Sequence, residues 1–179
     1  MFHNKTSPRI RMSVWMSVPA VAVLAAAFAV AVPSGAQGGR GAEAGIQAVR
    51  ALTARYQDEA AAIADGFTPT PVCVPNMGYH YVNYSRLDTR LEPSRPEALL
   101  FAPAPGGGRL LVGAEWIVVD ADQDLTTDDD RPAMFGHDFE GPMPGHEPGM
   151  PIHYDLHAYA WVGNPAGAFA PWNTSVICP

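Results

Sequence analysis

Three ionisable side chains alternate with apolar ones in the segment 151–161, near the end of the sequence. His153, Asp155 and His157 occupy every second position, and the positions between them are apolar. Successive side chains of a β-strand point to opposite faces, so the pattern predicts a strand with one core face and one polar face. Imidazole and carboxylate groups on one face can bind a transition metal or form a buried hydrogen-bond network.

Spacing along this strand limits which of the three residues can share an ion. Alternate strand residues lie roughly 7 Å apart, so Asp155 can act together with either His157 or His153. His153 and His157, about 13 Å apart, are too far apart to share one ion comfortably. Any further ligands must come from neighbouring strands.

His80 and Glu115 are the best candidates for those further ligands, because each lies among apolar residues on a predicted strand. A buried carboxylate without a partner costs several kcal/mol or is protonated, so Glu115 needs an Arg, a His or a metal beside it. We therefore predict that His80, Glu115 and His157 converge. We expect Asp155 beside them, as a ligand or as a carboxylate that orients the His157 ring, and His153 less directly involved.

Two histidines with one or two carboxylates suit zinc, copper or another divalent transition metal. A structural or interaction domain of the cell envelope is an open alternative, in which the same residues form a buried polar network that fixes the strand register. A metal-dependent hydrolase is a third hypothesis, which would require an open coordination position. No HExxH, nucleophile-elbow or Cys-x-x-Cys motif is present, so the sequence does not decide whether the protein is an enzyme.

Residues 120–151 show no convincing periodicity and are predicted to form one long loop, acidic at first and then rich in Gly and Pro. Asp120, Asp122 and Asp124 begin like a calcium-binding loop, but Leu125 replaces the required Gly and Arg131 replaces the bidentate Glu. A solvated acidic loop is therefore favoured over an irregular calcium site. The second half contains Met and His residues of a kind that binds copper, without a regular ligand spacing: His137, Met143, His146 and Met150.

The N-terminal segment has the features of a secretory signal peptide. A basic start precedes an apolar run from Val14 to Val32, and small residues follow, which predicts cleavage after Ala36. The mature protein would then be a single domain, residues 37–179, that is secreted or periplasmic and no longer attached to the membrane. An uncleaved membrane anchor is the alternative.

Charge and composition exclude several functions for the predicted mature domain. It has 18 acidic and 8 basic residues, a net charge of −10, which argues against binding to nucleic acid or to anionic membranes. Lys5 is the only lysine of the chain, so the mature domain has no Schiff-base or phosphate-loop lysine. Its partners are not indicated.

The two cysteines, Cys73 and Cys178, both lie in the mature part. Because an exported protein folds in an oxidising compartment, they are predicted to form a disulfide.

The elements expected to position these residues form an α+β fold. Ala-rich periodicity predicts a helix over 43–64, which ends at Asp65-Gly66. Strands are predicted over 78–83, 97–103, 109–119 and 151–162. We therefore expect an N-terminal helix packed on a mainly antiparallel sheet of four to five strands.

Several short motifs resemble an uncharacterised family of small exported bacterial proteins. They are Met77–Asn83, Leu99-Leu100-Phe101, Phe135-Gly136, Asp155-Leu156-His157, Asn164-Pro165, Phe169, Trp172-Asn173 and Cys178. The resemblance covers most of the mature chain and implies export. It implies no activity, cofactor or catalytic residue.

Overall fold

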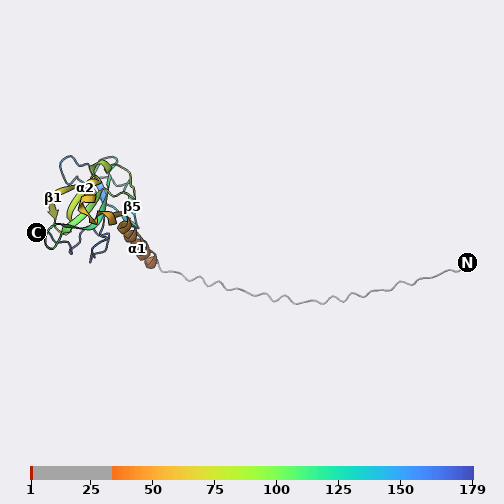
Figure 1. Cartoon of the computed structure of the whole chain (residues 1–179). Coiled ribbons are helices and arrows are strands. Elements are labelled where there is room, and N and C mark those ends of the chain that lie inside the picture. The colour runs from red at the N-terminus through yellow and green to blue at the C-terminus, as the bar shows by residue number, and fades with distance from the viewer. Residues whose placement is uncertain (2–33) are drawn as a thin grey trace. The chain divides into compact units, whose positions relative to one another are not determined.

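The computed structural model describes residue 1 and residues 34–179 of the chain (Figure 1). Most of the predicted signal peptide, residues 1–36, therefore lies outside the described residues, and its cleavage stays a prediction. Within the described part of the chain, none of the helices has both the length and the apolar character needed to span a bilayer.

The N-terminal helical region has three pieces instead of the single helix predicted over 43–64. Helix α1 (Ser34–Thr53) begins earlier than predicted, and a 3₁₀ turn η1 (Ala54–Gln57) separates it from α2 (Glu59–Ala64). The side chain of Asp58 accepts a hydrogen bond from the Ala60 N–H at 3.0 Å and so caps the start of α2. This cap is the physical reason for the break.

A six-stranded antiparallel sheet, with the order β1-β2-β3-β4-β8-β7, forms the centre of the fold (Figure 1). Its strands are β1 (Thr68–Val74), β2 (Gly78–Val82), β3 (Ala98–Pro103), β4 (Arg109–Val119), β7 (Glu140–Met143) and β8 (His153–Ala158). A short 3₁₀ turn, η2 (Tyr84–Arg86), follows β2. The predicted α+β class and antiparallel sheet are confirmed.

The two edge strands, β1 and β7, were not predicted as strands, and both contain proline. Pro69 and Pro71 lie in β1, and Pro142 lies in β7. Proline cannot donate a ladder hydrogen bond, so it is tolerated at the edge of a sheet and not at its centre. The prediction of one long loop over 120–151 was therefore wrong in its second half, which also contains the hairpin of β5 (Ala133–Met134) and β6 (His137–Asp138).

The helices cover one face of the sheet and form the main core there. Val49 and Tyr56 pack with the buried side chains of Trp116 and Leu156 on the helix-facing side of the sheet. The opposite face, which we call the polar face, carries His80, Glu115, His153, Asp155 and His157. Two small apolar clusters also lie on that side, one around Leu100, Val112, Tyr159 and Val176 and one around Val82, Ala98, Ile117 and Met150.

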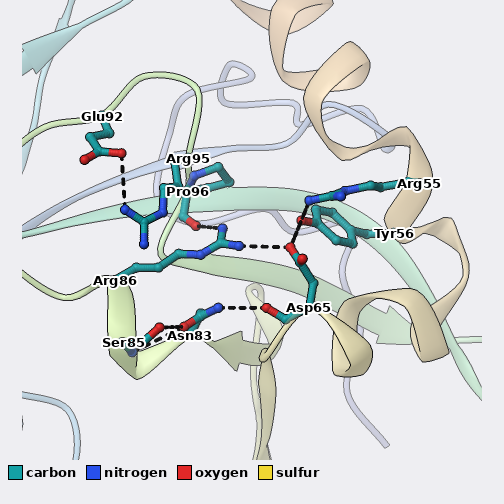
Figure 2. A network of polar contacts seen from close by, with 9 residues as sticks. All are labelled: Arg55, Tyr56, Asp65, Asn83, Ser85, Arg86, Glu92, Arg95 and Pro96. Atoms are coloured by element: carbon teal, nitrogen blue, oxygen red, sulfur yellow. Dashed lines mark hydrogen bonds and ion pairs between the residues drawn. The ribbon is translucent and has the colours of Figure 1, made fainter.

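Arg86 connects the helical region to the segment between β2 and β3, as Figure 2 shows. Its guanidinium lies 2.9 Å from the carboxylate of Asp65 and donates to the Pro96 carbonyl at 2.9 Å. Asp65 also pairs with Arg55 at 2.8 Å, and its carbonyl accepts from Asn83 at 3.0 Å. The network fixes how α2 leads into the sheet.

The sulfur atoms of Cys73 and Cys178 lie at bonding distance, as the sequence predicted. The pair joins edge strand β1 to the C-terminal segment, and Figure 1 shows the C terminus beside β1.

Candidate metal centre

Strand register brings the predicted residues together on the polar face. Glu115 of β4 is the direct partner of His157 on β8 and of Ala98 on β3. Ala98 is in turn the partner of Val82, two positions after His80 on β2. Directly opposed residues of an antiparallel pair share a face, so His80, Glu115 and His157 lie on one side of the sheet.

The distances show that these three side chains form a compact group, which we call the Glu115 group: His80, Glu115 and His157. His80 Nε2 lies 3.5 Å from Glu115 Oε2, and His157 Nε2 lies 3.7 Å from Glu115 Oε1. One ligand atom from each residue lies within 4.8 Å of the other two. The convergence predicted from the sequence is therefore seen in the structure.

Asp155 lies on the other side of the His157 ring. Its Oδ1 is 3.6 Å from His157 Nδ1, whereas Glu115 approaches Nε2. The negative charge beside Nδ1 favours a proton on that nitrogen, so Nε2, on the side of the Glu115 group, is the ring atom that a cation would bind after displacing its proton. Asp155 thus occupies the position of an orienting carboxylate, one of the two roles expected for it.

Several polar atoms of this region are buried without a hydrogen-bond partner in the described part of the chain. They are Glu115 Oε2, Asp155 Oδ1, His153 Nε2 and both ring nitrogens of His157. Each buried unpartnered polar atom costs about 1–3 kcal/mol. Native proteins contain few such atoms, and a cluster of them needs a physical explanation, such as a bound ion or ordered water.

Burial and mutual charge set the protonation of the Glu115 group. Burial raises the pKa of Glu115, against the lowering effect of His157. Burial alone would lower the pKa of His157, but Glu115 and Asp155 raise it above the ordinary value. Burial, reinforced by the charge of His157, lowers the pKa of His80 to about 3. The His80 imidazole is therefore neutral at neutral pH and keeps a free lone pair for a cation.

A second group of potential ligands, which we call the His153 group, consists of His146, His153 and Asp155. One ligand atom from each of these residues lies within 4.8 Å of the other two. His153, predicted as a more distant member of the first site, belongs to this group instead. The sequence analysis named His146 only among the copper-type residues of the Gly/Pro segment and did not connect it to the strand residues, because it has no periodic spacing to them.

The acidic segment at 120–124 makes local hydrogen bonds. Asp122 accepts from the Asp124 N–H at 2.9 Å and from the Thr127 hydroxyl at 2.8 Å, and Asp124 accepts from the Thr126 N–H at 3.0 Å. Among the described residues, Asp120, Asp122 and Asp124 do not form a group with three ligand atoms within 4.8 Å of one another. Calcium binding there stays a prediction.

The Glu115 group is almost closed to solvent. The side chains of His80, Glu115 and His157 are 13%, 2% and 1–2% exposed. A cavity of about 530 Å³ between α1, β6 and residues 166–171 is lined in part by His157, and by neither His80 nor Glu115. Closed sites are typical of structural metal ions, whereas catalytic ions keep a position open to substrate.

No family model, curated protein or solved structure matches the chain. The arguments for a function therefore start from the geometry of the two groups.

Proposed function

We propose that the protein is an exported metal-binding domain that holds one divalent transition-metal ion, best suited to zinc, through His80, Glu115 and His157. Two imidazoles and a carboxylate are a three-ligand set of zinc, in which a water molecule or another group completes the tetrahedron. The predicted signal peptide and the cysteine pair support export.

The observation that carries the proposal is the spacing of the imidazole nitrogens from the Glu115 carboxylate. The separations of 3.5 Å, from His80 Nε2 to Oε2, and 3.7 Å, from His157 Nε2 to Oε1, are longer than the 2.7–3.2 Å or so of a protein hydrogen bond. Two donors that each lie about 2.0–2.1 Å from a tetrahedral ion are roughly 3.3–3.4 Å apart. The spacing therefore suits ligands around one ion better than it suits a directly bonded polar network. The low exposure of the group favours a tightly held ion over a hydrolytic one.

The test is the metal content of the full chain isolated from its natural compartment, with matched variants. We expect about one equivalent of zinc per wild-type protein, measured by inductively coupled plasma mass spectrometry. His157→Ala and Glu115→Gln should contain none, because two ligands hold an ion far more weakly than three. His153→Ala should weaken zinc binding less. His137→Ala removes an exposed histidine of β6 outside both groups and should bind zinc as the wild type does.

A second measurement separates this proposal from a structural polar network. Zinc should raise the melting temperature of the metal-free protein, because a ligand at 100 times its Kd stabilises the native state by about 2.7 kcal/mol. If zinc leaves the melting temperature unchanged while His157→Ala lowers it, the residues form a polar network and the metal proposal is wrong.

A further inference from the structure

The His153 group lies beside a methionine thioether. Met143 on β7 is the direct partner of His153 on β8, so their side chains are neighbours on one face. The sulfur of Met143 lies 3.3 Å from Nε2 of His146. Three potential ligands of two chemical types, thioether and imidazole, are therefore gathered at the edge of the sheet.

The tautomer of His153 is set by the backbone. Its Nδ1 lies 3.0 Å from the Pro151 carbonyl oxygen, which can only accept, so Nδ1 carries the proton. The lone pair is then on Nε2, which is buried and has no hydrogen-bond partner among the described residues. His153 is 0% exposed, so this unpartnered nitrogen lies inside the protein and not at its surface.

The loop that carries His146 is held in place, although His146 itself is exposed. The Tyr84 hydroxyl donates to Glu147 at 2.5 Å, and Met150 packs against the apolar cluster of Val82 and Ile117. The loop is also tightly folded, because a Cβ atom on Gly145 would lie 2.1 Å from the Met150 carbonyl oxygen. The His146 ring therefore lies next to the His153 ring, and the two ring centroids are 4.9 Å apart.

We propose that Met143, His146 and His153 form a second metal site, separate from the Glu115 group, that binds a cuprous ion. A thioether is a soft ligand that selects Cu(I), and imidazole is compatible with it. The separation of 3.3 Å between the Met143 sulfur and His146 is in the range of two ligands on one ion. Asp155, which lies between the two groups, supplies a negative charge close to the cation.

The test is an anaerobic Cu(I) titration of the full chain against a chromogenic Cu(I) chelator. Met143→Leu keeps the side-chain volume and removes the sulfur, and His146→Asn removes an exposed imidazole, so both variants should fold. We expect each to weaken Cu(I) binding at least about 10-fold, since the loss of even a residue that orients a ligand typically costs about 10–100-fold. His80→Ala should weaken zinc binding and leave the Cu(I) affinity within about 2-fold of the wild type, because His80 is not a ligand of this site.

X-ray absorption at the copper edge gives an independent measurement. The wild type should show one sulfur and two nitrogen neighbours, and Met143→Leu should lose the sulfur. The proposal is wrong if Met143→Leu and His146→Asn both bind Cu(I) like the wild type. It is also wrong if His80→Ala alone abolishes Cu(I) binding, since copper would then occupy the Glu115 group. Failure of zinc binding with intact Cu(I) binding would contradict only the proposed function above.

Discussion

Glu97 is another buried carboxylate next to the polar face, and it replaces a missing backbone acceptor. Strand β3 begins at Ala98, and the carboxylate of Glu97 accepts a hydrogen bond from the Ile117 N–H of β4 at 2.9 Å, beyond the last backbone pair. Glu97 is 3% exposed. Burial raises its pKa from 4.5 to about 8, although the Ile117 hydrogen bond acts in the opposite direction. The carboxyl group is therefore neutral in the native protein at neutral pH.

This raised pKa predicts that stability falls as the pH rises. The unfolded protein ionises Glu97 above pH 4.5, whereas the folded protein keeps the proton until about pH 8. The unfolded state therefore binds fewer protons between these values, and the free energy of unfolding decreases by an amount on the order of 5 kcal/mol. Glu97→Gln keeps an acceptor and cannot ionise, so it should be more stable than the wild type at pH 8 and similar near pH 4.5.

Urea unfolding of the metal-free protein between pH 4.5 and 8.5 measures this effect. Glu92→Gln is the matched control, because the Glu92 side chain is 41% exposed and pairs with Arg95 at the surface. If Glu97→Gln and the wild type showed parallel pH profiles, the native state would not hold Glu97 protonated.

At the scale of the element, a bulge in β4 changes which side chains face the helices. Leu100 of β3 pairs with Gly113, and the next residue, Phe101, pairs with Leu111, so Val112 is an extra residue in β4. Simple alternation predicts Leu111 on the same face as Glu115. In the structure Leu111 joins the helix-side core and Val112 joins the opposite cluster, because a bulge reverses the alternation.

Gly113 allows the end of β8 to cross over this bulge. A Cβ atom at Gly113 would lie 2.4 Å from the Ala158 carbonyl oxygen. The segment that follows β8 is held close to Gly113 by a hydrogen bond of 3.1 Å, which the Trp161 N–H donates to the Val112 carbonyl. Gly113→Ala should therefore destabilise the protein by about 1–3 kcal/mol, the usual cost of overpacking. Gly163→Ala, with no atom within 4 Å, should change stability by less than about 0.5 kcal/mol in the same denaturant titration. Equal midpoints for the two variants would contradict this account.

At the scale of the whole molecule, the C-terminal segment closes the polar face. Val176 packs with Leu100 and Tyr159, and the Tyr159 ring stacks on His157 at a centroid distance of 6.3 Å. The bond from Cys178 to Cys73 fixes the end of this segment to β1. The disulfide therefore stabilises the fold and keeps the C-terminal segment with Val176 packed against Tyr159, whose ring lies over His157 of the Glu115 group.

Reduction of this disulfide should lower the melting temperature. The bond joins residues that are 105 positions apart in the sequence. Its loss returns conformational freedom worth on the order of 4–5 kcal/mol to the unfolded chain. Thermal unfolding with and without dithiothreitol measures the effect, and the double variant Cys73→Ser with Cys178→Ser should be insensitive to the reductant. Peptide mapping that finds two free thiols in the protein isolated from its natural compartment would contradict the pairing.

The sequence by itself determined the local features of the site. Alternation placed His153, Asp155 and His157 on one face, the apolar surroundings of Glu115 showed that it needs a partner, and composition predicted the cysteine pair. Each of these depends on residues close in sequence or on the count of a residue type, which a single sequence contains.

The sequence predicted that His80, Glu115 and His157 converge, because Glu115 needs a partner, but only the tertiary structure decided through which strand pairs they meet and which other side chains lie beside them. The β4–β8 register sets Glu115 opposite His157. A folded loop brings His146 to His153 and Met143. The proline-containing strands β1 and β7 can join the sheet because they lie at its edges. A side chain's face is a property of its own strand, whereas its neighbours depend on strand register and loop path. Those are fixed by contacts between residues distant in sequence, so spacing along the chain does not reveal them.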